Sequence, residues 1–251
     1  MEDIFPSISP TAEQIQRILG EKSDLKKAEF LQRFFKTGKG EYAEGDLFLG
    51  ISVPETRKIA RQHSAAPYPE LEKLLSSPYH ESRLVALLIL CQQFGWGTPS
   101  EREKIFNFYW KISHRINNWD LVDLSCPKIV GEFLLDKDRS LLYQKADSPL
   151  LWDQRISIVS TITFIRRFEY TDTLNIAYKL IPHSHDLIRK ATGWMLREIG
   201  KRDRPTLEKF IEAHVRDMSS ITLRYAIEHF TSEERNRYLS LRKQKPYFKQ
   251  N

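Results

Sequence analysis

The chain has 251 residues, 41% of them apolar, with a formal charge of +6 and a pI of about 9.2. This length suits one large domain or an extended repeat array, and no stretch of about 20 apolar residues could cross a bilayer. We therefore expect a single soluble domain over residues 1–251 that makes no membrane contact. Its folded core should cover about 11–241, and a basic tail that can be disordered should follow at 242–251. The excess of Lys and Arg favours polyanionic partners, although many basic proteins bind no nucleic acid.

The start of the chain and its two cysteines favour a reducing cytoplasm. Residues 1–6 carry neither the basic segment nor the apolar run of a signal peptide. Cys91 and Cys126 are far apart in sequence and lack a metal-ligand spacing, so we expect two inert packing thiols. His183 and His185 start a helix without nearby cysteines or carboxylates, a pattern that rarely binds metal. The sequence therefore predicts no metal site, and with no visible oligomerisation signal we expect a monomer.

Helical periodicity runs through the whole chain, and convincing strand alternation is absent. Apolar residues recur at spacings of three and four, and prolines and glycines divide this pattern into helices of one to two dozen residues. In chain order we expect helices at 11–19, 25–36, 54–63, 68–76, 79–94, 99–114, 119–133, 138–146, 149–168, 172–181, 184–200, 205–215, 219–229 and 232–241.

The expected helices form pairs in which a shorter helix precedes a longer one. The pairs at 68–94, 138–168 and 172–200 resemble one another, which gives a period of roughly 30 to 40 residues. Two helices per unit at this period are typical of an α-solenoid, in which each unit buries its apolar face against its neighbours. Sequence identity between the units is low, and a globular all-α bundle is the alternative.

The helix expected at 184–200 carries a tryptophan away from its buried face. On a helical wheel, Ile188, Ala191, Met195 and Ile199 form the buried stripe. A different face gathers one aromatic and three basic residues: Lys190, Trp194, Arg197 and Lys201. Such a tryptophan can stack on a base or sugar while the cations meet phosphates. Equally, it can pack against an adjacent helix under Lys and Arg stems.

Arg155 shows the reverse anomaly, because it falls within the apolar stripe of the helix expected at 149–168. A buried guanidinium normally needs a carboxylate or phosphate partner. Near a helix start it can instead extend to water, and both readings stay open. Asp153, in the first turn, is more simply a favourable charge at a helix N-terminus.

The pentad of residues 119–123 places an indole and a carboxylate on one helix face. Asn117 or Asn118 is a natural N-cap, and Trp119 and Asp123 then lie four residues apart as an exposed pair. A carboxylate beside an aromatic wall can stabilise an oxocarbenium-like transition state or hold a water. From spacing alone, a surface salt bridge of Asp123 is favoured over catalysis. Asp120 points elsewhere and is interpreted as a dipole-complementing or capping charge.

Four segments resemble the AlkD-type DNA alkylation repair proteins in order and spacing, from about Tyr42 to His229. They are Phe48-Leu49-Gly50-Ile51 with Pro54-Glu55-Thr56-Arg57, Asn118 to Asp123, Trp152-Asp153-Gln154-Arg155, and Lys190 to Glu198. The resemblance implies a right-handed superhelix of HEAT-like antiparallel helical pairs that grips duplex DNA.

Members of that family act as monofunctional DNA glycosylases. They hydrolyse the N-glycosidic bond of positively charged N3- and N7-alkylated purines, without metal or organic cofactor. By resemblance, Asp123 is the catalytic carboxylate, Trp119 and Trp194 flank the lesion-bearing deoxyribose, and Arg155 contacts a phosphate. Tyr42 is a further candidate for the same DNA-binding surface, with uncertain spacing. This reading places the protein in the bacterial cytoplasm at the nucleoid.

Two other functions stay open. The chain could be a catalytically inactive relative that binds DNA, or a HEAT-type protein scaffold whose surface carries mixed-charge or apolar anchors. A scaffold would bind its partner with little dependence on salt, whereas phosphate contacts release counterions and make binding salt-dependent.

Overall fold

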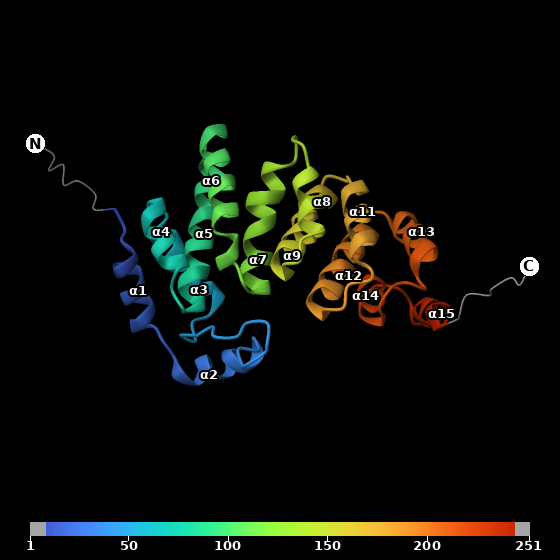
Figure 1. Cartoon of the computed structure of the whole chain (residues 1–251), viewed down its shortest axis with the longest axis horizontal. Coiled ribbons are helices and arrows are strands. Elements are labelled where there is room, and N and C mark those ends of the chain that lie inside the picture. The colour runs from blue at the N-terminus through green and yellow to red at the C-terminus, as the bar shows by residue number, and fades with distance from the viewer. Residues whose placement is uncertain (1–8, 244–251) are drawn as a thin grey trace, which may run out of the picture. The chain divides into compact units, whose positions relative to one another are not determined.

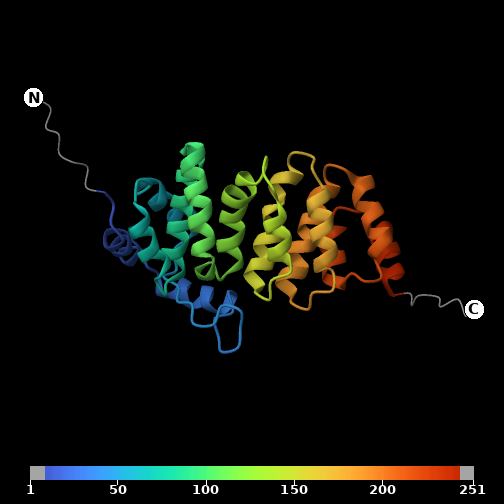
Figure 2. The ribbon, with the colours of Figure 1, turned by 45° about the horizontal axis from the view of Figure 1, so that its top comes forward.

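The computed structural model describes residues 9–243 and divides the chain into two compact units, 1–129 and 130–251, each taken here by itself. Figure 1 shows that the regular elements of both units are helices. Residues 9–243 contain no strand, apart from an isolated bridge between Leu47 and Tyr79. Within each unit successive helices lie side by side, as the turned view in Figure 2 also shows. The predicted all-α class is confirmed, and the arrangement is consistent with an α-solenoid.

The first unit contains seven α-helices and a short 3-10 turn among its described residues. They are α1 (Ala12–Glu21), α2 (Leu25–Phe34), α3 (Val53–Gln62), α4 (Tyr68–Leu75), α5 (His80–Trp96), α6 (Pro99–Lys111), η1 (Ser113–Arg115) and α7 (Trp119–Cys126). Helix α5 is its centre, because α3, α4, α6 and α7 all pack against it. Its residues from His80 to Cys91 are all buried, polar ones included.

The second unit is built around α12. Its described helices are α8 (Ser140–Ala146), α9 (Leu151–Ser160), α10 (Ile162–Ile165), α11 (Thr171–Leu180), α12 (Asp186–Gly200), α13 (Arg204–His214), α14 (Ser220–Ala226) and α15 (Ser232–Lys243). Helix α12 packs against α9, α11, α13 and α14. The buried stripe expected on it is confirmed, since Ile188, Ala191, Met195 and Ile199 are at most 1% exposed.

Two predicted helices are shorter than expected. The helix expected at 119–133 ends at Cys126, and residues Pro127–Gly131 form a π turn, because a proline has no N–H to continue the hydrogen-bond ladder. The helix expected at 149–168 breaks at Thr161 into α9 and α10. There the Thr161 hydroxyl donates to the carbonyl of Ile158 at 2.7 Å, a local bond that competes with the helix ladder.

The first two residues of the expected basic tail belong to a helix. Arg242 and Lys243 complete α15, and Nε of Arg242 donates to the carbonyl of Met218 at 2.7 Å. The rest of the expected tail, 244–251, lies outside the described residues. No described helix is both long and apolar enough to span a bilayer. A single domain over 1–251 and the right-handed superhelix stay predictions.

Candidate functional site

The start of α7 positions the predicted indole and carboxylate. Asn118 is the N-cap, and its side-chain oxygen accepts the backbone N–H of Trp119 at 2.8 Å. Trp119 and Asp123 then lie one helical turn apart, while Leu121 and Val122 point into the core. The pair is half-buried rather than exposed as expected. Both side chains therefore remain reachable by a ligand but are held by their surroundings.

The Trp119 indole is fixed by an aromatic stack that spacing did not predict. Its ring lies 5.2 Å from the ring of Phe35 at an interplanar angle of 14°, and Phe34 meets it edge-on at 6.3 Å. Phe35 in turn stacks on Phe48 at 4.9 Å, and Phe48 stacks on the imidazole of His80 at 4.5 Å. The Phe34-Phe35 pair at the end of α2 is the sequence signal that could have pointed to this stack.

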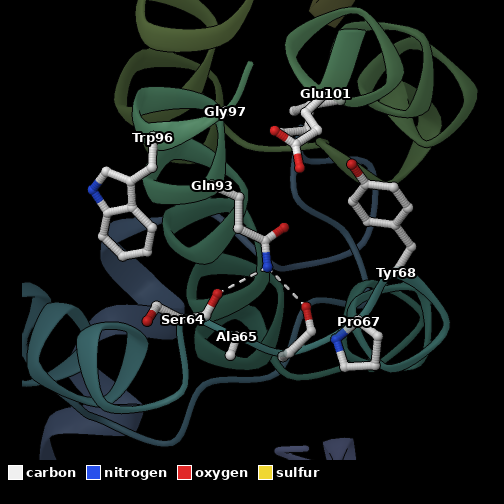
Figure 3. A pocket seen from close by; sticks show the side chains of 10 residues that line it. Ser64, Ala65, Pro67, Tyr68, Gln93, Trp96, Gly97 and Glu101 are labelled. Carbon is white, nitrogen blue, oxygen red and sulfur yellow. Dashed lines mark hydrogen bonds between the residues drawn. The ribbon is translucent and has the colours of Figure 1, made fainter.

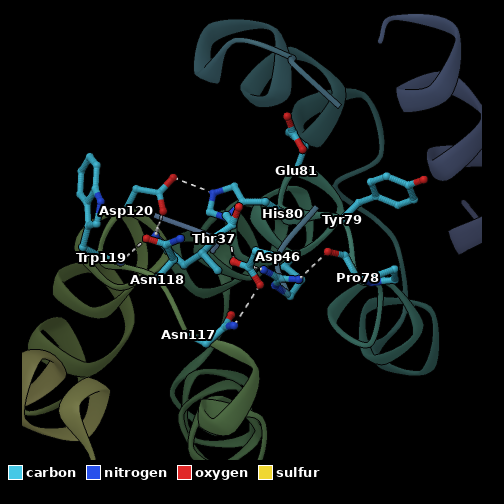
Figure 4. Close-up of polar contacts among 12 residues, drawn as sticks. Thr37, Asp46, Pro78, Tyr79, His80, Glu81, Asn117, Asn118, Trp119 and Asp120 are labelled. Atoms are coloured by element: carbon cyan, nitrogen blue, oxygen red, sulfur yellow. Dashed lines mark hydrogen bonds and ion pairs between the residues drawn. The ribbon is translucent and has the colours of Figure 1, made fainter. Parts of the chain in front are cut away.

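Asp120 lies in the first turn of α7, as expected, and it also makes a long-range contact that spacing did not predict. Its carboxylate is buried, and Oδ2 lies 2.8 Å from Nε2 of His80. Figure 4 shows this pair beside a second carboxylate, Asp46, whose Oδ2 lies 3.8 Å from Nδ1 of His80 and 2.7 Å from a guanidinium nitrogen of Arg83. Asp120 is thus an acidic residue of the first turn of α7 that also forms a buried ion pair with His80.

The two carboxylates keep His80 protonated. Burial alone would lower the pKa of this imidazole, but the charge of Asp120, the hydrogen bond to Asp120 and the nearby carboxylate of Asp46 outweigh it and raise the pKa of His80 to about 9. Asp46 responds in the opposite direction. Burial would raise its pKa, yet bonds and charges from His80, Arg83 and Asn117 lower it below the ordinary value. The start of α7 thus rests on a charged, buried network.

The Phe48-Leu49-Gly50-Ile51 segment is held by Glu81. The buried carboxylate of Glu81 accepts the backbone N–H groups of Leu49, Gly50 and Ile51 at 2.9, 2.8 and 3.2 Å. Gly50 has φ +83°, and a Cβ there would lie 2.2 Å from the carbonyl oxygen of Asp24. The motif is therefore explained by backbone geometry, which places Phe48 in the aromatic stack.

Helix α12 divides the Lys-Ala-x-Gly-Trp-x-Leu-Arg-Glu motif into packing and accessible positions. Gly193 allows close approach to α14, because a Cβ there would lie 2.5 Å from the carbonyl oxygen of Thr222. Trp194 is half-buried and Lys190 is exposed, outside the buried stripe as predicted. Arg197 and Glu198 are half-buried as well, so the accessible positions of the motif are these four residues.

The other two predicted cations of α12 are paired within the protein. Arg197 forms an ion pair with Glu228, and Nζ of Lys201 lies 2.7 Å from a carboxylate oxygen of Glu198. An ion pair at the surface contributes little stability, so phosphate could replace the carboxylate partner. Lys190 is the more exposed basic candidate on this helix.

Arg155 is only 5% exposed, which favours the buried one of the two readings that its place in the apolar stripe left open. One guanidinium nitrogen donates to the carbonyl of Leu187 in α12 at 2.5 Å, in a partly buried bond. Asp153 lies in the first turn of α9, as expected, and also accepts from Lys145 at 3.0 Å and from Ser148 at 2.9 Å. The Trp-Asp-Gln-Arg segment therefore ties α9 to its neighbours.

Tyr42 is the remaining candidate residue, and a cavity lies in the first unit. Tyr42 is half-buried in the segment between α2 and Leu47. A cavity of about 530 Å³ opens beside Tyr68 and Trp96, where Nε2 of Gln93 donates to the carbonyls of Ser64 and Ala66 (Figure 3). No predicted site residue lines it. In the described part of the chain, no group of three His, Cys, Asp or Glu residues is arranged to hold a metal ion.

These features define an all-helical protein of stacked helical pairs, with an accessible indole and carboxylate on one turn of α7 and an accessible indole beside basic residues on α12. Residues 15–230 match the model of the family described as DNA alkylation repair enzyme. The chain belongs to this DNA alkylation repair family.

A solved structure supports the same fold. It is described as a predicted DNA alkylation repair enzyme from Enterococcus faecalis, and it superposes with a TM-score of 0.64 at 16% sequence identity. The match covers 84% of this chain and 97% of the other. No curated protein sequence matches the chain.

Proposed function

We propose that the protein is a monofunctional DNA glycosylase for positively charged N3- and N7-alkylated purines in duplex DNA. The observation that carries the proposal is the pairing of Trp119 and Asp123 on one turn of α7, both half-buried, in a chain of the DNA alkylation repair family. A fixed indole and a carboxylate together suit a cationic reacting centre.

The chemistry follows from the charge of the lesion. An alkylated, cationic purine is already a good leaving group, so little acid catalysis is needed. Asp123 stabilises the positive charge that grows on the sugar as the bond breaks, and it positions the attacking water. The Trp119 ring attracts the same cationic centre, a contact worth about 0.5 to 2 kcal/mol. A neutral purine lesion, which leaves poorly, is a poor substrate.

The second unit contributes to binding the duplex in this proposal. Trp194 supplies a further aromatic surface for the deoxyribose, Arg155 contacts a phosphate, and Lys190 adds a charge to the same strand. Arg197, Lys201 and Tyr42 are secondary candidates. In this proposal the protein acts at the nucleoid, as a monomer and without metal or cofactor.

Base release decides this proposal. Duplexes with a single 7-methylguanine or 3-methyladenine are incubated with the protein, and free base is quantified. We expect release of these cationic bases and none of a neutral lesion such as 1,N6-ethenoadenine. Failure to release any cationic base while Asp123 is intact would reject the glycosylase.

One observation favours a second candidate, a catalytically inactive binding or scaffold protein. Arg197 and Lys201 are paired with Glu228 and Glu198, which gives α12 a partly mixed-charge surface. Binding to undamaged duplex separates the two cases. A strong decrease in affinity with salt indicates phosphate contacts, and affinity insensitive to salt indicates a protein scaffold.

A further inference from the structure

Two separate sets of contacts connect His80 to Trp119 in the first unit. One is polar and runs through Asp120, the residue that follows Trp119 in the chain. The other is aromatic and runs through Phe48 and Phe35. His80 is the residue at which the two sets meet, and it is only 2% exposed.

The polar contacts fasten the first turn of α7. His80 bonds Asp120 at 2.8 Å and lies 3.8 Å from a carboxylate oxygen of Asp46. Oδ1 of Asp46 accepts from the side-chain amide of Asn117 at 3.1 Å, just before the Asn118 cap. The residues on both sides of Trp119 are therefore attached to one buried network (Figure 4).

The aromatic contacts fasten the indole itself. The imidazole of His80 is within 18° of parallel to the Phe48 ring, Phe48 within 23° of Phe35, and Phe35 within 14° of Trp119. Stacked rings resist tilting because offset contact is lost on rotation. A shift of the imidazole would be transmitted to the indole through two phenylalanines.

We propose that His80 is a positioning residue for the Trp119–Asp123 pair, and that its imidazolium holds both the first turn of α7 and the aromatic stack in one arrangement. The inference rests on the proposed glycosylase function only for its effect on excision. Its structural part, a fixed Trp119 indole, is tested without any substrate.

Protonation of His80 maintains the contacts that hold the first turn of α7 and the aromatic stack. Two carboxylates face His80: Asp120 on α7 and Asp46 in the loop between α2 and α3. Arg83 lies on the same helix as His80 and pairs with Asp46, while the carboxylate of Glu81 accepts backbone N–H groups. A neutral imidazole has one N–H and no charge to offset two buried carboxylates. Deprotonation would therefore loosen the network at Asp120.

Space for such a movement exists beside the stack. A mostly apolar cavity of about 340 Å³ is lined by His80, Asp120, Phe35, Phe48 and Phe34, together with residues of α2 and α3. Phe35 can move into it without entering close-packed core. The ring stack is therefore held by the contacts between its own rings rather than by close packing on every side.

The first experiment follows an indole ring C–H signal of Trp119 by NMR from pH 7 to pH 10 in the full-length protein. Its signal is assigned by its loss in Trp119→Phe. We expect a shift of this signal with a midpoint near pH 9, matching the raised pKa of His80. A signal that stays constant over this range, with the remaining spectrum folded, would overturn the proposal.

The second experiment compares His80→Gln with Tyr109→Phe at pH 7. His80→Gln removes the charge and the ring, whereas Tyr109→Phe removes a buried hydrogen bond to Ser125 in the last turn of α7 (2.9 Å). For His80→Gln we expect a moved Trp119 signal and single-turnover release of 7-methylguanine slowed by about 10-fold or more, with duplex affinity within about 2-fold. For Tyr109→Phe we expect the Trp119 signal and the rate of 7-methylguanine release to stay near those of wild type.

The outcomes separate this inference from the proposed function. If wild type releases no base, the glycosylase is rejected, but the NMR titration and the displaced signal in His80→Gln still support the positioning of Trp119. If wild type is active and His80→Gln matches it in both readouts, the inference is overturned. Equal effects of both variants would show general loosening of α7 and would also overturn it.

Discussion

The backbone N–H of Gly50 donates to the carboxylate of Glu81 at 2.8 Å, joining two residues that are 31 positions apart. This bond and its neighbours from Leu49 and Ile51 hold the turn before α3 against the start of α5. Phe48 enters the aromatic stack beneath Trp119 from the same turn. The candidate site on α7 therefore depends on a carboxylate that touches none of its residues directly.

Removal of this carboxylate should destabilise the first unit. Glu81→Ala leaves three backbone N–H groups without their acceptor, and we expect a loss of about 3 to 5 kcal/mol in the free energy of unfolding. Urea denaturation followed by circular dichroism measures the loss. Glu29→Ala, at an exposed position of α2, is the control and should change stability by less than about 0.5 kcal/mol. A loss as small as that of the control would contradict the assigned bonds.

Stability should fall at alkaline pH because of His80. Its pKa is raised to about 9 in the folded protein from an ordinary 6.5. A raised pKa contributes stability that is fully present below about pH 6.5 and is lost as the pH rises through about 9. The full contribution is roughly 3 kcal/mol. Urea midpoints from pH 6 to 10 should decrease over this window in wild type, and a His80→Gln protein with the same decrease would argue against the assignment.

Excision should depend on the charge of Asp123. Asp123→Asn keeps the size of the side chain but removes the charge that stabilises the cationic sugar, and we expect base release at least about 100-fold slower. Duplex affinity should stay close to wild type, as measured by fluorescence anisotropy. Glu103→Gln removes an exposed carboxylate on α6 and should leave both quantities unchanged. Full activity in Asp123→Asn would exclude it as the catalytic carboxylate.

The salt dependence of DNA binding should show which cations of the second unit contact phosphates. Lys190 is exposed, whereas Lys201 is held by Glu198 at 2.7 Å. If Lys190 meets a phosphate, Lys190→Ala should lower the slope of log affinity against log salt by about 1, and Lys201→Ala by less. Arg155→Ala tests the remaining phosphate contact in the same titration. An unchanged slope in Arg155→Ala would assign the guanidinium to contacts within the protein, such as its bond with Leu187.

The stability of the second unit should depend on the planar guanidinium of Arg139. The guanidinium of Arg139 bonds Asp172 and Glu169, each at 2.7 Å, donates to the carbonyls of Leu134 and Leu135, and lies 3.8 Å above the Phe164 ring. A lysine cannot make this planar set of contacts, so Arg139→Lys should cost about 1 to 3 kcal/mol. Thermal unfolding measures it, with the exposed Arg61→Lys as control. Equal melting temperatures would show that charge alone suffices at position 139.

Sequence patterns predicted most of the helices, the buried stripe of α12 and the place of Trp194 outside that stripe, but not the half-buried state of Trp119 and Asp123. The predicted features follow from helical periodicity and capping, which depend on residues three or four apart. Arg155 shows where such reasoning stops, because periodicity placed it in the core but could not choose its partner, a carbonyl 32 positions away.

Only the tertiary structure decided what supports the candidate site. The bond of Asp120 to His80 joins residues 40 positions apart, and the stack on Trp119 joins α2, the turn before α3 and α7. Spacing along one helix carries no information about such pairs, since they form when separate helices pack. Asp120 therefore looked like a helix-terminal charge in the sequence, and the folded first unit made it half of a buried ion pair.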